Sequence, residues 1–179
     1  MIRRKLVPLF CLWTAVALAA GPTARELVKS AQAKAASEDK VVLLNFGASW
    51  CPYCQRLDAW LERPEIKRVF IRYFVPVQLS VRETEHKATS KRPDTRGADS
   101  LFDRYGGPAS IPLLVFLDKQ GKVIVNSIRT DKTNIASPGR PEEASFFVQM
   151  LKKAAPRISD EDLKVVETSL KAIDKPLLD

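Results

Sequence analysis

The sequence is poor in the residues that bind metal ions or build a disulfide framework. Its 179 residues include three cysteines and one histidine, His86, which stands alone in a polar stretch. A structural zinc site takes four Cys, His or carboxylate ligands, and this chain has only one Cys-x-x-Cys pair. Small domains stapled by disulfides contain more cysteines than this. We therefore expect no bound metal and a core held by apolar packing.

Internal repeats and low-complexity tracts are also missing, and no apolar run in the body of the chain is long enough to span a membrane. The composition, 45% hydrophobic and 28% charged, is that of a globular protein. The formal net charge of +8 comes without a basic stripe of interleaved aromatic residues, so we expect no nucleic-acid binding. These features predict a single domain over residues 21–179.

The first twenty residues differ from the rest. A basic start at residues 3–5 precedes an apolar run from Leu6 to Ala20, which contains an Ala-x-Ala motif at residues 17–19. This order is typical of a secretory signal peptide, so we expect residues 1–20 to be removed and the protein to be exported, in a bacterium to the periplasm. An uncleaved membrane anchor is the alternative, for which the run is short.

Removal of the leader would take Cys11 with it and leave Cys51 and Cys54 as the remaining thiols. The charge of the remaining chain would then be about +5. An exported protein with one close pair of cysteines has no disulfide framework, so this pair is free to cycle between dithiol and disulfide.

Hydrophobic periodicity predicts helices that alternate with strands. Helices are expected over residues 23–38, 52–70 with a break or kink at Pro64, 100–107, 142–155 and 159–173, and strands over 40–46, 72–81, 112–118 and 122–128. The last two strands form a hairpin, and residues 82–100 form a polar surface loop. This order predicts an α/β fold, in which helices cover both faces of a mixed central sheet.

Local signals place several boundaries. Thr23 and Glu26 have the spacing of a capping box, and Ser159 precedes the last helix in the same way. Pro52 suits a first helical turn, because its missing N–H would be unpaired there. Pro76 indicates an edge strand or a bulge.

The motif Cys51-Pro52-Tyr53-Cys54 lies between a buried strand and the start of a helix. Unpaired amides at a helix N-terminus stabilise a thiolate, so Cys51 is expected to be the exposed nucleophile. Cys54, one turn further, would resolve the mixed disulfide. Half of a metal site and a structural disulfide are the alternatives. The first lacks further ligands, and the second closes too small a loop to stabilise much.

Two stretches, "FGASWCPYC" and "GGPASIPLLVFLDKQGKVI", resemble the thioredoxin superfamily in sequence and in order. The resemblance covers residues 41–151 and leaves the helical extension over 157–174 outside it. It implies a thioredoxin fold with an extra C-terminal helix. It also implies that Ile111 and Pro112 form the family's cis-proline dipeptide, which faces the cysteines and presents the backbone of Ile111 to an extended substrate. Trp50 would flank the active site.

The sequence also departs from the thioredoxin pattern. Asn45 replaces the buried acid that helps to move the proton of the second cysteine, so Cys54 needs water or another base. The Pro52-Tyr53 dipeptide is typical of glutaredoxins, and Ala59 stands where thioredoxins have a proline. The text "WCPYCQRLDAWLERPEI" resembles instead the exported bacterial thioredoxin-like branch, whose partners are commonly other exported proteins.

Other residues have both a functional and an ordinary explanation. Tyr53 lies within the motif and is expected to be exposed, where it can contact partner proteins. Asp58 is either a proton relay for Cys54 or a surface charge, and the surface charge is the more common case. His86 is expected to be solvated. Six aromatic residues fall on apolar faces and are expected in the core: Trp60, Phe70, Phe74, Phe116, Phe146 and Phe147.

We interpret the sequence as an exported thiol–disulfide oxidoreductase. It would exchange disulfides with exported protein thiols, and it would use another dithiol, membrane-bound or soluble, as electron donor or acceptor. No bound cofactor is needed, because the cysteine pair itself carries the electrons. The alternative is a thioredoxin-fold binding module or chaperone that holds client thiols, for example during cytochrome maturation, with little turnover.

Overall fold

The computed structural model describes residues 21–106 and 110–172. The expected signal peptide and the last residues of the C-terminal extension lie outside these ranges. In chain order the elements are α1 (Ala24–Glu38), β1 (Val41–Gly47), α2 (Pro52–Leu61), α3 (Pro64–Tyr73), β2 (Phe74–Ser80), the 3-10 helix η1 (Glu83–His86), α4 (Ala98–Gly106), β3 (Leu113–Leu117), β4 (Val123–Asn126), α5 (Pro141–Ala154) and α6 (Asp160–Lys171). In the described ranges, no helix is both long and apolar enough to cross a membrane.

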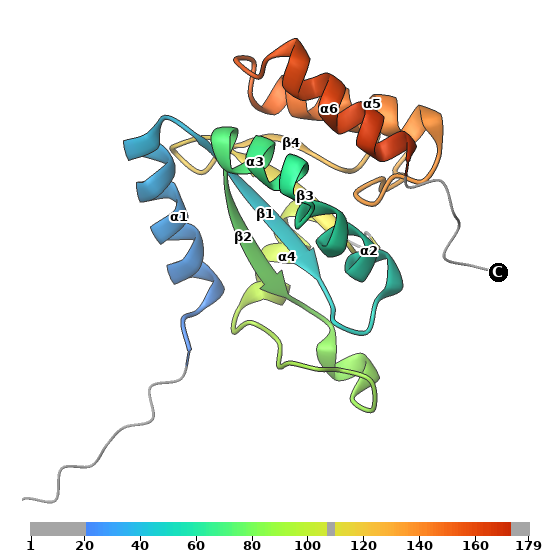
Figure 1. Cartoon of the computed structure of the whole chain (residues 1–179). Helices are drawn as coiled ribbons and strands as arrows, with labels where there is room; N and C mark the ends of the chain where they lie inside the picture. Colours follow the sequence, from blue (N-terminus) through green and yellow to red (C-terminus); the bar gives the residue numbers. More distant parts are fainter. Residues whose placement is uncertain (1–20, 107–109, 173–179) are drawn as a thin grey trace, which may run out of the picture.

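The four strands form one mixed sheet in the order β2-β1-β3-β4 (Figure 1). β1 pairs in parallel with β2 and antiparallel with β3, and β3 pairs antiparallel with β4. The predicted hairpin is therefore confirmed, with Gly121 at a φ of +84° in its turn, a conformation that favours glycine. Pro76 lies on the edge strand β2, as expected for a residue without an N–H to donate.

Alternation along the strands gives the sheet two apolar faces. On one face, Val42, Leu44 and Phe46 of β1 pack with the buried residues of α1 and α4. On the other face, Leu43 packs with residues of α2, α3, α5 and α6. Helices therefore cover both faces (Figure 1), and the predicted thioredoxin fold is confirmed.

The predicted helix starts are confirmed in detail. The Glu26 amide donates to Thr23 Oγ1 at 3.3 Å, and the Thr23 amide donates to Glu26 Oε2 at 2.7 Å, which completes a capping box. The Asp162 amide donates to Ser159 Oγ at 3.1 Å. Pro64 begins the separate helix α3, so the chain breaks there rather than bends.

The extra C-terminal helix α6 packs against α5 and α3. Its apolar side chains Leu163, Val166 and Leu170 are buried, as predicted. Polar contacts add to this packing. The Trp60 indole N–H donates to Ser169 Oγ at 3.0 Å, and the Tyr73 hydroxyl donates to Asp162 Oδ2 at 2.6 Å. These contacts join α6 to the end of α2, the helix that carries the cysteines, and to the end of α3.

Residues 82–100 were expected to form a plain surface loop, and this prediction is incomplete. The segment contains η1 and the start of α4, and its Glu83 is only 2% exposed. We call residues 82–95 the insert. In Figure 1 it lies below the carboxyl ends of β1 and β2, at the opposite end of the molecule from α5 and α6.

Candidate functional site

The two cysteines lie where β1 ends and α2 begins. Cys51 is the N-cap residue of α2, and the Cys54 amide donates to its Sγ at 3.2 Å. Pro52 occupies the first turn, as predicted. A Cβ at Gly47 would lie 3.3 Å from Cys54 Sγ, so the glycine lets β1 approach the second cysteine closely.

Both sulfur atoms are shielded from solvent. Cys51 is 3% exposed and Cys54 is 2% exposed, so the expectation that Cys51 is the exposed member of the pair is wrong. The reason is packing, because Ala48, Trp50 and Ile111 surround the pair. The cysteines are free, and the structure therefore describes the dithiol form.

The two thiols have opposite electrostatic environments. The hydrogen bond from the Cys54 thiol lowers the pKa of Cys51 to about 7, assisted by the Cys54 and Tyr53 amides and opposed by burial. The pKa of Cys54 is raised, first by that same hydrogen bond, which Cys54 makes as the protonated partner, and then by burial. Cys51 is thus the thiol that ionises first, and a thiolate is the reactive form.

A second segment faces the cysteines. The peptide bond between Ile111 and Pro112 is cis, as the resemblance implied, and Ile111 O lies 3.8 Å from Cys51 Sγ. We call residues 110–112 the proline wall. Asn134 Nδ2 donates to the carbonyl oxygens of Ser110 at 2.6 Å and Pro112 at 2.7 Å, and Asn134 Oδ1 accepts from Ser127 Oγ at 2.7 Å.

Tyr53 is 40% exposed, as expected for the middle of the motif. The Arg56 guanidinium lies over its ring at 5.4 Å from the centroid. Arg56 also donates from Nε to Ser137 Oγ at 3.0 Å and from Nη2 to the Ser137 carbonyl. The arginine therefore ties the segment after β4 to the helix that carries the cysteines.

A polar cluster lies beneath the cysteines. Asn45 is buried on β1, and its Nδ2 donates to Asp58 Oδ1 at 3.0 Å and to Gln78 Oε1 at 2.7 Å. None of the residues in 21–106 and 110–172 donates a hydrogen bond to Asn45 Oδ1. Burial raises the pKa of Asp58 against the hydrogen bond from Asn45, which lowers it. Asp58 is half-buried and hydrogen-bonded to Asn45, so it is not the ordinary surface charge that was expected.

Trp50 is held by the insert. Its indole N–H donates to the Arg82 carbonyl at 2.9 Å, and its ring lies against His86 with centroids 4.0 Å apart. His86 is exposed, as predicted, but it is in contact with the site rather than alone in solvent. This contact could not be predicted from the sequence, because 36 positions separate Trp50 from His86.

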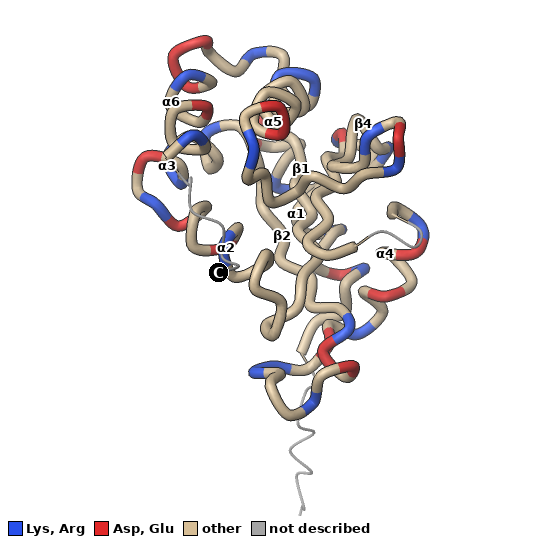
Figure 2. Tube along the Cα trace, turned by 90° about the vertical axis from the view of Figure 1, so that its right-hand side faces the viewer, with Lys and Arg blue, Asp and Glu red and all other residues tan. Residues whose placement is uncertain are grey.

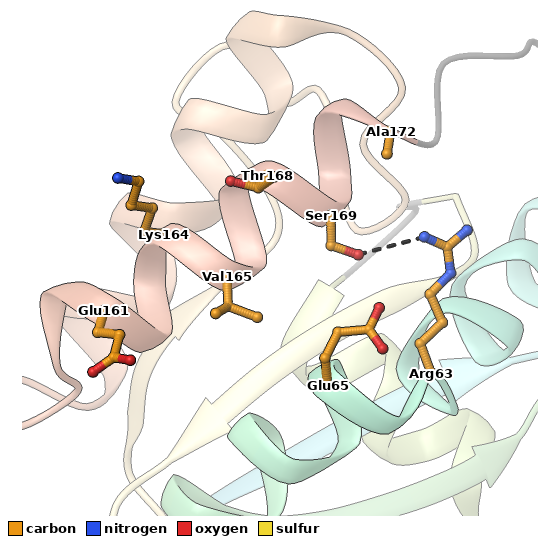
Figure 3. A pocket seen from close by; sticks show the side chains of 8 residues that line it. All are labelled: Arg63, Glu65, Glu161, Lys164, Val165, Thr168, Ser169 and Ala172. Atoms are coloured by element: carbon orange, nitrogen blue, oxygen red, sulfur yellow. Dashed lines mark hydrogen bonds between the residues drawn. The ribbon is translucent and has the colours of Figure 1, made fainter.

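A hollow between α3 and α6 lies away from the cysteines (Figure 3). Arg63 and Glu65 line one side, and Lys164, Thr168 and Ser169 of α6 line the other. Arg63 Nη1 donates to Ser169 Oγ at 3.4 Å across it. Because Ser169 also accepts from Trp60, these polar groups hold α6 in place. Among the described residues, no group of three His, Cys, Asp or Glu side chains is placed to hold a metal ion.

A sheet with the order β2-β1-β3-β4, a Cys-x-x-Cys motif that begins α2 and a facing cis-proline together define the class of thioredoxin-fold proteins. The family model described as thioredoxin-like matches residues 23–119. The chain therefore belongs to the thioredoxin-like family. A search of curated protein sequences finds no match.

The chain is similar to several solved structures. The crystal structure of a disulphide isomerase from Xylella fastidiosa Temecula1 is 22% identical, covers 89% of this chain and 100% of its own, and has a TM-score of 0.53. A DsbH oxidoreductase is 18% identical over 76% of this chain and 83% of its own, with a TM-score of 0.47. A thioredoxin from Thermus thermophilus is 23% identical over 69% and 80%, with a TM-score of 0.44.

Proposed function

We propose that this protein is an exported thiol–disulfide oxidoreductase that exchanges disulfides with protein partners through Cys51 and Cys54. The observation that carries the proposal is the asymmetry of the pair. Cys51 has a pKa of about 7 at the start of α2 and lies 3.8 Å from the Ile111 carbonyl, whereas the pKa of Cys54 is raised. Cys51 therefore ionises near neutral pH, while Cys54 keeps its proton until it is needed.

The reaction has two exchange steps. The Cys51 thiolate attacks one sulfur of a partner disulfide, forms a mixed disulfide and releases the first partner thiolate. Cys54 then loses its proton and attacks Cys51 Sγ, which releases the second partner thiolate and leaves a Cys51–Cys54 disulfide. Two electrons pass to the partner, and the reverse sequence oxidises a partner dithiol. The potential of the pair and its redox partner decide the direction.

We assign the proton acceptor for Cys54 to Asp58, in place of the acid that Asn45 replaces. Its charge raises the pKa of both cysteines, and burial raises its own pKa. The hydrogen bond from Asn45 Nδ2 holds the carboxylate in the cluster beneath the pair. The structure places no atom of Asp58 in hydrogen-bond contact with Cys54, so the proton travels through water.

The partner-binding residues we propose are Trp50, Tyr53, Ile111 and Pro112. Trp50 and Ile111 pack against the cysteines, and the side chain of Tyr53, between Cys51 and Cys54, is exposed. Export, with residues 1–20 as signal peptide and residues 21–179 as the mature domain, completes the proposal. Mass spectrometry of the protein recovered from a bacterial periplasmic fraction tests it, and the expected N-terminus is Gly21.

A second candidate is a binding module that holds client thiols with little turnover, and the burial of both sulfur atoms favours it. Replacing Cys54 by Ser separates the two functions. An oxidoreductase loses turnover of a protein disulfide and accumulates mixed disulfides through Cys51, which appear as protein adducts on non-reducing gels. The Cys51→Ser variant is the matched control and forms no adducts. Unchanged client binding by both variants, without adducts, contradicts the oxidoreductase.

The reduction potential is the other decisive measurement. The mature protein is equilibrated in glutathione buffers and alkylated, and mass spectrometry then gives the fraction of the cysteine pair that is reduced. A value near about −270 mV is that of thioredoxin and indicates a reductase, whereas a value near about −120 mV indicates an oxidase that donates its disulfide. A pair that does not exchange with glutathione at any ratio contradicts the proposal.

A further inference from the structure

The insert, residues 82–95, is fixed beside the nucleophile although it contains almost no apolar side chains. It leaves β2 at Ser80 and returns to the same residue, where the Thr95 amide donates to the Ser80 carbonyl at 2.9 Å and the Ser80 amide donates to Thr95 Oγ1 at 3.0 Å. The insert therefore closes on itself at the carboxyl end of β2, next to the segment that carries Cys51 (Figure 1).

The buried carboxylate of Glu83 connects the insert to that segment. Its oxygens accept from the Ser49 amide and from Ser49 Oγ, each at 2.7 Å. They also accept from Ser90 Oγ at 2.7 Å and Arg92 Nε at 3.2 Å, within the insert itself. Burial opposes these hydrogen bonds, yet they hold the pKa of Glu83 below its usual value. Ser49 is two residues before Cys51, so this carboxylate fixes the peptide that leads into the nucleophile.

Trp50 lies between the insert and the cysteines. Trp50 packs against the Cys51–Cys54 pair, and the Arg82 carbonyl and the His86 ring hold its other side. A partner segment that lies on the backbone of Ile111 would therefore meet the insert on the opposite side of Cys51. The proline wall and the insert would then contact the same partner segment on either side of Cys51.

The charges of the insert do not cancel, because it contains four Lys and Arg residues against three Asp and Glu residues (Figure 2). Glu83 pairs with Arg92, and Glu85 lies 3.7 Å from Arg82. Asp94 accepts from the Glu83 amide at 2.8 Å. Lys87 and Lys91 are exposed, and neither forms an ion pair with another residue that the structure describes. The Lys91 amide donates to Ser49 Oγ at 2.8 Å, which places the backbone of this lysine beside the segment before Cys51. Lys87 directly follows His86, whose ring lies against Trp50.

We propose that the insert is a recognition surface for acidic client segments, in which Lys87 and Lys91 attract carboxylates that flank the client's reactive cysteine. The partner is an extended protein segment with Asp or Glu on either side of that cysteine. The proposal rests on the function proposed above, and it adds the class of client. Unpaired surface charges near a reactive site raise the rate of encounter with oppositely charged partners, and salt screens the effect.

Two synthetic peptides test the proposal. Each carries one cysteine joined by a disulfide to thionitrobenzoate, flanked in one peptide by two Asp residues and in the other by two Asn residues. Attack by reduced Cys51 releases coloured thionitrobenzoate, because this thiol is the better leaving group. At low salt, we expect the Asp peptide to react about fivefold faster than the Asn peptide, and the ratio to fall toward one in 1 M NaCl.

Charge-matched variants locate the effect. The Lys87→Gln, Lys91→Gln double variant should lower the ratio to below about twofold. The control, Lys153→Gln with Lys164→Gln, removes the same charge from α5 and α6 at the far end of the molecule and should keep the wild-type ratio (Figure 1). A wild-type ratio near one, or a ratio that the insert variant retains, overturns the proposal. Absence of release from both peptides overturns the oxidoreductase function, and the recognition surface with it.

Discussion

The proline wall and the insert lie on two sides of Cys51, but different chemistry holds each of them. Asn134 positions the proline wall through neutral amide hydrogen bonds to the Ser110 and Pro112 carbonyls. Glu83 positions the insert through a buried carboxylate that accepts from Ser49, Ser90 and Arg92. Hydrogen bonds to a charged group are stronger than neutral ones but depend on its ionisation. The insert is therefore the side of the site that responds to pH.

Removal of the Glu83 carboxylate should have the largest effect. Glu83→Ala leaves the Ser49 amide and Arg92 without their acceptor, and we expect a loss of about 3 kcal/mol in the free energy of unfolding. Urea titration followed by tryptophan fluorescence measures the loss and also reports on Trp50. Glu85→Ala, in the same 3-10 helix but exposed, is the control and should cost less than about 0.5 kcal/mol. Equal losses in the two variants would contradict the role of Glu83.

The proline wall should be easier to disturb without unfolding the protein. Asn134→Asp keeps the shape of the side chain but replaces the donor by an acceptor, which then faces the Ser110 and Pro112 carbonyls. We expect a loss of about 2 kcal/mol in stability and about tenfold slower reduction of a protein disulfide. Gln120→Ala, in the hairpin turn, is the control and should change neither. Normal kinetics for Asn134→Asp would show that the wall does not position the partner.

Acid should weaken the insert and spare the proline wall. The folded-state pKa of Glu83 is lowered, so its ionised form stabilises the protein above the unfolded pKa of about 4.3, and this contribution is lost as the pH falls through the folded value. The stability difference between wild type and Glu83→Gln should therefore shrink from pH 6 to pH 3.5. The difference between wild type and Asn134→Ala should stay constant over the same range. Urea titrations at each pH measure both.

A change in the polar cluster of Asn45, Asp58 and Gln78, beneath the cysteines, should give the smallest effect. The charge of Asp58 raises the pKa of Cys51, so Asp58→Asn should lower it and make alkylation by iodoacetamide about twofold faster at pH 6. Glu62→Gln, one turn further and exposed, is the control. If Asp58 is also the proton acceptor for Cys54, the variant resolves mixed disulfides more slowly even though Cys51 attacks faster. A parallel rise of both rates would leave Asp58 with an electrostatic role only.

The sequence predicts the parts of this structure that depend on local chemistry. The capping box at Thr23, the edge position of Pro76 and the start of α2 at Pro52 each follow from one residue type and its neighbours. The cysteine pair is found for the same reason. The roles of Glu83 and Asn134 could not be predicted, because Glu83 binds a residue 34 positions away and Asn134 binds residues 22 to 24 positions away. In addition, nothing in a charged segment indicates which of its charged residues is buried.

The burial of Cys51 was mispredicted for a related reason. A helix N-terminus is usually accessible, but Trp50 and Ile111 close over this one, and their approach depends on the insert and the proline wall. The prediction for Asp58 was wrong because its hydrogen-bond partner, Asn45, belongs to β1. From the sequence alone Asp58 has the pattern of an exposed helical residue, whereas in the fold its side chain faces β1. Local patterns identify the reactive atoms, whereas the contacts that tune them come from distant segments.

The contacts of α6 have a practical consequence for the design of a shorter version of this chain. The thioredoxin-like match ends at residue 119, yet Trp60, on the helix of the cysteines, donates its indole N–H to Ser169. Cutting the chain after α5 would expose the buried surface of Trp60 and leave the Tyr73 hydroxyl without its acceptor, Asp162. We therefore expect a stable shortened chain to need the residues through Leu170, although the family match ends at residue 119.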